Sequence, residues 1–160
     1  MYRIRIVISL GLLFCIPAIQ AQTLNFNLTG TITPGVCQFT VADVDLGTYS
    51  AALFTGSYST TAVDVPVTIQ RCDPLVTAVR MDVSGEADAA DSNLFKGVAG
   101  IGIDLRSALN GVIRPAGTRV NYNPNTGGGT YTFKAKFKQS AATVAAGTVK
   151  APITITVTYN

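Results

Sequence analysis

Histidine and tryptophan are absent from this chain of 160 residues, and only 13% of its residues are charged. Without histidine the chain cannot build a Ser-His-Asp or Cys-His catalytic device, and it lacks the imidazole ligand that most zinc and copper sites use. Most enzyme classes are therefore excluded, and we expect no catalytic residue, no metal site and no cofactor. The charged fraction is about half the ~25% typical of soluble proteins, which indicates that a partner covers part of the surface.

The first 21 residues have the pattern of a secretory signal peptide. A short cationic start with Arg3 and Arg5 precedes an apolar stretch over residues 6–16, and the segment ends at the small residue Ala21. We place the cleavage after Ala21 and expect secretion without an anchor. A transmembrane anchor is the alternative, but the apolar run is well short of the ~20 residues needed to span a bilayer.

The basic charge of the chain belongs mostly to this leader. Removing residues 1–21 lowers Lys+Arg from 12 to 10 against 9 Asp+Glu, so the formal charge falls from +3 to +1. In the mature sequence Lys134, Lys136 and Lys138 alternate with apolar residues, which predicts the wet face of a strand rather than a phosphate-binding stripe. We expect neither nucleic acid nor a small-molecule substrate as a partner.

Two cysteines, Cys37 and Cys72, remain after cleavage. In a secreted chain an oxidised pair is the ordinary state, so we predict a Cys37–Cys72 disulfide. Such a bridge would close a loop of 35 residues and destabilise the unfolded state by about 3.8 kcal/mol in the chain-entropy model. Two free thiols or half of a metal site are the alternatives, but neither a CxxC spacing nor a histidine supports the metal site.

Alternation of apolar and polar residues dominates the mature sequence, with almost nothing at helical spacing. It predicts strands over residues 24–32, 63–69, 79–83, 101–105, 120–122, 131–137 and 153–159. Asn110-Gly111, the three glycines at 127–129 and other turn residues separate them. About seven short strands with one apolar face must stack two sheets, which predicts an all-β immunoglobulin-like sandwich; a closed barrel is the alternative. Residues 87–95 fit a short helical turn and a loop equally well.

Both terminal strands carry large apolar side chains. Residues 22–33 precede the first cysteine, and residues 153–159 run to one residue before the last, so we expect an open edge there. Edges of this kind recruit strands from other chains. On the residues alone, the favoured interpretation of 22–33 is still a strand paired inside its own sheet.

Two aspartate pairs are weak candidates for acid catalysis or calcium binding. Asp43 and Asp45 share one face of a strand-like segment, and Asp88 and Asp91 share a loop. No calcium-binding repeat surrounds either pair, so we interpret them as solvated surface residues.

Taken together, the residues resemble a chaperone-usher fimbrial subunit, a pilin of the type 1 or P fimbria kind. The resemblance covers the whole mature chain and rests on the order of several segments rather than on one motif. These are the secretory signal, residues 24–32, Cys37, Val44-Asp45-Leu46-Gly47, Cys72, residues 100–105, and the closing segments 146–151 and 153–160 with a penultimate tyrosine.

The resemblance implies an immunoglobulin-like sandwich that lacks its final strand and is completed by a donor strand from another chain. Residues 22–33 would be the donor-strand extension and residues 34–160 the pilin domain. The donor residues would be Leu24, Phe26, Leu28 and Ile32, with Gly30 as the small residue among them. Ile153, Ile155, Val157 and Tyr159 would border this subunit's groove, and the chaperone would grip the carboxylate of Asn160.

The resemblance also implies the function: a structural subunit of an adhesive surface fimbria that polymerises by donor-strand exchange. Its partners would be a periplasmic pilus chaperone, an outer-membrane usher and neighbouring subunits, and it would pass through the periplasm to an extracellular fimbrium. A free-standing or fibre-capping binding module, such as a single-domain adhesin or lectin, is the alternative. Its tyrosines are scattered rather than clustered for sugar stacking, which disfavours that alternative.

Overall fold

The computed structural model describes residues 27–31 and 36–159. The chain divides into two units, Met1–Ile32 and Thr33–Asn160. In the first unit the described residues 27–31, which include Leu28 and Gly30, form no regular element and are exposed. The predicted signal peptide and the candidate residues Leu24, Phe26, Ile32 and Asn160 lie outside the described residues.

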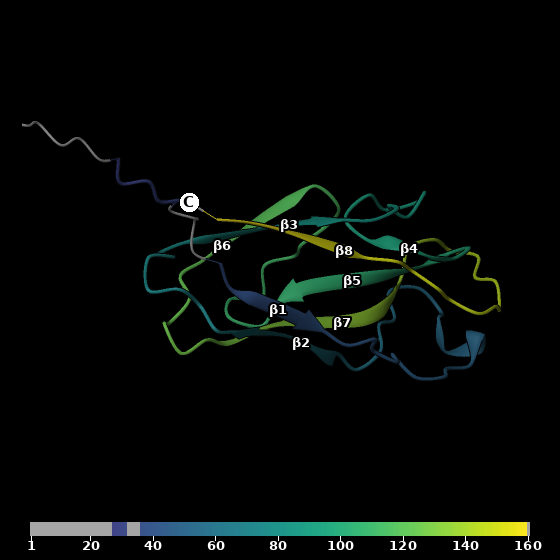
Figure 1. Cartoon of the computed structure of the whole chain (residues 1–160). Coiled ribbons are helices and arrows are strands. Elements are labelled where there is room, and N and C mark those ends of the chain that lie inside the picture. Colours follow the sequence, from purple (N-terminus) through teal and green to yellow (C-terminus); the bar gives the residue numbers. More distant parts are fainter. Residues whose placement is uncertain (1–26, 32–35, 160) are drawn as a thin grey trace, which may run out of the picture. The chain divides into compact units, whose positions relative to one another are not determined.

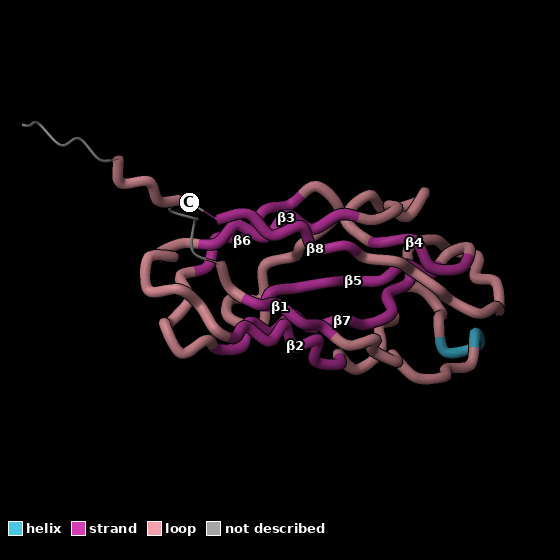
Figure 2. Tube along the Cα trace, viewed as in Figure 1, coloured by secondary structure: helices cyan, strands magenta, loops and turns pink. Residues whose placement is uncertain are grey.

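Within residues 36–159 the second unit forms eight strands and one short 3-10 helix (Figure 1). The strands are β1 (Gln38–Val41), β2 (Val63–Gln70), β3 (Val79–Ser84), β4 (Phe95–Val98), β5 (Ile101–Ser107), β6 (Thr118–Tyr122), β7 (Gly129–Gln139) and β8 (Thr154–Tyr159). The helix, η1, spans Ala51–Leu53. Figure 2 shows η1 as the cyan segment at the opposite end of the sandwich from the end of β8.

The strands form two antiparallel sheets, one in the order β1-β2-β7-β5-β4 and one in the order β6-β3-β8. This arrangement confirms the predicted all-β sandwich. It excludes the alternative prediction of a closed barrel. β1 lies at an edge of the larger sheet and pairs only with β2, while β8 lies at an edge of the smaller sheet and pairs only with β3. Each therefore has one edge that no strand within the described residues occupies.

Alternation of side chains builds the core between the two sheets. On β3 the side chains of Val79, Met81 and Val83 are buried, whereas Arg80 and Ser84 are exposed. The larger sheet contributes Phe133, which is fully buried, among others. The apolar side chains of β3 and of the centre of the larger sheet are thus hidden from water, as the period-two pattern predicts.

Strand β5 differs because it is buried on both faces. Its outer face at Gly102 is covered by Leu94, and a Cβ at position 102 would lie 2.7 Å from the Cβ of Leu94. Only glycine permits this close approach. The cover comes from residues 87–95, which contain turns and bends but no helix.

Two strands were not predicted from the sequence. β1 has only four residues, and β4 contains Gly97 and an irregular register between Lys96 and Val98. Neither presents enough alternating positions to stand out from a loop. The six strands predicted between residues 63 and 159 are confirmed.

The predicted disulfide joins Cys37, just before β1, to Cys72, just after β2. The last residue of β8 lies at the same place, because the Tyr159 hydroxyl donates a hydrogen bond of 2.8 Å to the Cys37 carbonyl oxygen. We call this end of the sandwich, where β1 begins and β2 and β8 end, the cystine end. The opposite end, which carries η1, is the η1 end (Figure 2).

Candidate functional site

An apolar groove of about 440 Å³ lies between the segment that follows β1 and the segment that precedes β8. Its first lip is formed by residues 44–49 and its second by residues 145–149 and Ala151. The floor includes Ile101 and Ile103 of β5 and Phe137 of β7. The groove therefore lies against the sandwich core beside η1.

The first lip keeps the alternation of a strand although it belongs to none. Val44 and Leu46 are half-buried, whereas Asp43 and Asp45 are exposed. Asp45 Oδ1 accepts a hydrogen bond of 2.9 Å from the Gly47 amide, and Gly47 has a φ of 89°, which favours glycine. Asp45 is among the lining residues of the groove and Asp43 is not, so the groove is not lined by an acid pair.

The second lip runs into β8. Ile153, Ile155 and Val157 are half-buried and pack against the core, whereas the intervening Thr154 and Thr156 are exposed. The backbone edge of β8 that does not face β3 has no partner strand among residues 36–159. These residues thus combine a core-facing side with an open backbone edge, and they continue the second lip beyond the lined part of the groove.

The two edges meet at the cystine end. Besides the hydrogen bond to Cys37, Tyr159 packs its ring against Phe39 of β1, with the ring centroids 6.3 Å apart. Tyr159 therefore links the end of β8 to β1 at the cystine end. Further along, residues 44–49 and 145–149 line the open part.

The sequence argument assigned border roles to residues of 153–160, none of which is among the residues that line this groove. Val44, Leu46, Val149 and Ala151, which do line it, were missed. The available signal was the alternation itself, because Val149 and Ala151 continue the period of Ile153 and Ile155 upstream of the strand. The floor residues gave no such signal, since they read as ordinary core.

The residues that line the groove are mostly apolar, but polar atoms make up most of the surface that it exposes. Among the lining residues only Asp45 carries a charge, and its side chain is exposed. No cluster of three or more metal-binding side chains occurs in the part of the chain that the structure describes. In the same part, no helix has the length and apolar character needed to cross a membrane. Apolar side chains and backbone hydrogen-bonding groups are what this site can bind.

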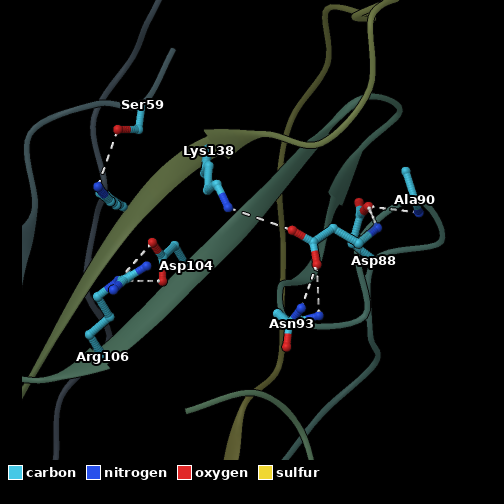
Figure 3. A network of polar contacts seen from close by, with 9 residues as sticks. Ser59, Asp88, Ala90, Asn93, Asp104, Arg106 and Lys138 are labelled. Atoms are coloured by element: carbon cyan, nitrogen blue, oxygen red, sulfur yellow. Dashed lines mark hydrogen bonds and ion pairs between the residues drawn. The ribbon is translucent and has the colours of Figure 1, made fainter. Parts of the chain in front are cut away.

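The second aspartate pair has a structural role that corrects the sequence interpretation. Asp88 is not solvated: it is 8% exposed and accepts hydrogen bonds from the amides of Ala90 and Asp91 (Figure 3). The pKa of the Asp91 carboxyl lies below its ordinary value, chiefly because it accepts a hydrogen bond from the Asn93 amide. Both carboxylates stabilise the loop that covers β5.

The outer face of the larger sheet carries the remaining polar contacts of this region (Figure 3). Asp91 lies 3.6 Å from the Lys138 ammonium, and the buried Asp104 pairs with the guanidinium of Arg106 at 2.9 Å. Lys136 donates a hydrogen bond to the Ser59 hydroxyl. Lys136 and Lys138 thus contact polar groups on the outer face of β7. This agrees with the prediction that the lysines lie on the solvent-facing side of a strand.

A family model described as Fimbrial protein matches residues 26–160. The chain is 28% identical over 158 residues to the uncharacterized fimbrial-like protein SfmA of Escherichia coli (strain K12), covering 88% of this chain and 86% of that protein. It is also 28% identical to the fimbrial subunit type 1 of Salmonella typhimurium, with 89% and 84% of the two chains covered.

Two solved structures share the fold. The P pilus rod subunit PapA matches with a TM-score of 0.65 and 18% identity, over 76% of this chain and 99% of PapA. A subunit in the structure of a chaperone-usher pilus matches with a TM-score of 0.67 and 18% identity, over 91% of this chain and 100% of that one. The shared fold is an immunoglobulin-like sandwich that lacks its final strand.

Proposed function

We propose, from the premise that this chain belongs to the fimbrial protein family, that its groove receives the N-terminal extension of another subunit. The chain is a fimbrial subunit, a structural protein of an extracellular pilus rather than an enzyme. Donor-strand exchange is the step by which we propose that it joins its neighbours.

One observation carries the proposal: β1 and β8 each leave a strand edge unpaired, and the segments that follow β1 and precede β8 form the lips of a groove lined mostly by apolar residues. Ile155 and Val157 already face the core but are only half-buried. An added strand would supply backbone partners to the open edge of β8 and cover these side chains. The missing layer is therefore one strand with an apolar side chain at every second residue.

Residues 22–33 have that pattern. Leu24, Phe26 and Leu28 alternate with asparagines, and Leu28, the described member of this set, is 88% exposed. Burying Leu24, Phe26, Leu28 and Ile32 at roughly 1.5 to 3 kcal/mol each gives about 6 to 12 kcal/mol before the cost of ordering the strand. This is enough to hold a fibre joint. Gly30 would let the two backbones approach closely at one point of the groove.

An empty groove is a hazard for a monomer, because an apolar groove beside an open strand edge promotes aggregation. We therefore propose that a periplasmic chaperone covers the groove and holds the Asn160 carboxylate until an outer-membrane usher brings the next subunit. The match to a subunit of a chaperone-usher pilus supports this route. Transit through the periplasm follows from the proposed signal peptide at residues 1–21.

The described tyrosines do not favour the alternative of a sugar-binding module. Tyr49 packs against Phe137, Tyr58 against Phe54, and Tyr122 against Tyr131. Sugar stacking needs aromatic rings that gather on one open surface. In the described region these rings instead pair with aromatic neighbours of the same chain.

The matched variants Leu28→Asp and Asn27→Asp test the proposal. On a period-two strand the two residues face opposite sides, so Leu28→Asp would place a carboxylate in the groove while Asn27→Asp would leave it in solvent. We expect Leu28→Asp to abolish fibre assembly and Asn27→Asp to leave it nearly unchanged. Both chaperone-bound subunits should melt like the unmodified chain, because the strand serves the neighbour.

The opposite result is equally clear. If Leu28→Asp unfolds the subunit itself while the remaining folded protein still assembles, residues 22–33 form an internal strand and the proposal is wrong.

A further inference from the structure

The cystine end carries two exposed apolar side chains on segments that are joined by hydrogen bonds. Leu75 is 77% exposed and Val36 is 57% exposed. They adjoin the same residue, because the Asp73 amide donates to the Val36 carbonyl oxygen at 3.2 Å and the Leu75 amide donates to Asp73 Oδ1 at 2.8 Å. We call Val36 and Leu75 the end patch.

The turn that presents Leu75 is rigidly held. On one side Cys72 is covalently bound to Cys37, and on the other Val76 is buried, with its amide donating to the Asp73 carbonyl oxygen at 2.9 Å. Arg71, next to the disulfide, has a φ of 51°, which is uncommon for any residue but glycine. An apolar side chain that is fixed in an outward position loses little entropy when a partner covers it.

The η1 end offers a counterpart at the mouth of the groove. Leu53 is 47% exposed, while its neighbours Ala51 and Phe54 line the groove. The Ser50 hydroxyl accepts a hydrogen bond from the Ala52 amide and so caps this short helix. Leu53 thus lies beside the groove without forming part of its wall.

The direction of the incoming strand follows from where the chain's own extension leaves. Residue 36 leads directly into Cys37, so the extension departs from the cystine end. The cystine end of the acceptor already adjoins the subunit that receives the acceptor's own extension. In a linear fibre the subunit that supplies the incoming strand must therefore lie at the acceptor's η1 end. The strand then runs antiparallel to β8, which is the stronger pairing.

The connection is too short to keep the two bodies apart. Three residues lie between Ile32, the last donor position, and Val36, so the Cα atoms of these two residues are at most about 14 Å apart. The end patch of the donor subunit must therefore lie close to the η1 end of the acceptor. We propose that the end patch of one copy packs on Leu53 of the next copy, which adds a second contact at each joint and rests on the proposed function.

The test compares fibres built from the full chain with single leucine changes. Leu75→Asp and Leu53→Asp should each shorten the half-life of the fibre in detergent by about tenfold, the loss expected for one buried leucine contact. Leu109→Asp is the matched control, since Leu109 is 78% exposed. Leu109 belongs to the turn after β5. The Ala108 amide donates to the carbonyl oxygen of Thr132, which lies three residues into β7, so this turn is set back from the cystine end.

A charge pair and a free peptide separate this proposal from the proposed function. Leu75→Asp combined with Leu53→Lys should restore most of the lost half-life. A synthetic peptide of residues 22–33 lacks the end patch, so its affinity for the full-length Leu53→Asp chain should equal that for the unmodified chain. If Leu75→Asp fibres last as long as Leu109→Asp fibres while the peptide binds, the end contact is wrong. If the peptide does not bind, both proposals fail.

Discussion

At the scale of single residues, Tyr159 joins the two open edges of the sandwich. Its hydroxyl reaches the carbonyl of Cys37 and its ring packs on Phe39. The sequence singled out Tyr159 through its penultimate position and its place in the alternation of residues 153–159. The hydrogen bond partner lies 122 residues away in the chain, so no local pattern could have predicted it.

Tyr159→Phe should cost about 1 kcal/mol of unfolding free energy, because it removes one hydrogen bond and keeps the ring contact. Urea unfolding of the subunit with a bound donor peptide measures this. Tyr122→Phe is the control, since the Tyr122 ring also packs on an aromatic neighbour and no hydrogen bond of its hydroxyl occurs within the described region. Equal unfolding midpoints for Tyr159→Phe and the unmodified chain would show that the link contributes nothing.

A second prediction at this scale concerns Asp82 and its pH dependence. A hydrogen bond from Arg119 holds the pKa of Asp82 below its ordinary value of 3.8. The ionised pair therefore stabilises the fold at pH values above 3.8. This contribution disappears as the pH falls through the lowered pKa of Asp82. Arg119→Gln should raise the pKa of Asp82 more than Arg80→Gln does, as followed by NMR of the carboxyl carbon. A pKa that is unchanged in Arg119→Gln contradicts this cause.

At the scale of elements, alternation was sufficient wherever a strand had five or more residues. β2 and β7 followed from their valines and aromatic residues, since one face is buried and the other is wet. The lips of the groove were not predicted as a site, because their alternating residues lie outside the hydrogen-bonded strands. Their role depends on which edges stay unpaired, which is a property of the sheet order.

The disulfide ties the start of β1 to the segment after β2, and its loss should weaken the cystine end as a unit. The double variant Cys37→Ser/Cys72→Ser should lose about 2 to 5 kcal/mol of unfolding free energy. Chemical denaturation of the chaperone-bound chain, with and without reductant, gives this difference. An unmodified chain whose unfolding midpoint does not move on reduction would refute a stabilising role for the bridge.

At the scale of the whole molecule, the second unit is a sandwich that lacks its final strand. The low charged fraction of the sequence predicted that a partner covers part of the surface. The groove is the part of the surface to which we assign that partner. The sequence alone could not locate it, because Ile101, Ile103 and Phe137 have the pattern of any core residue. Ile101 and Ile103 are buried like any core residue, so only the groove lining distinguishes them.

The most direct measurement adds the proposed strand to the chain itself. Residues 22–33 fused by a short turn after Asn160 should pair antiparallel with β8 and fill the groove. We predict that this chain melts cooperatively at a clearly higher temperature than the unmodified chain. A fusion of the same length that carries aspartate at the positions of Phe26 and Leu28 should show no such increase. Equal melting temperatures for all three chains would contradict the claim that the groove is completed by this strand.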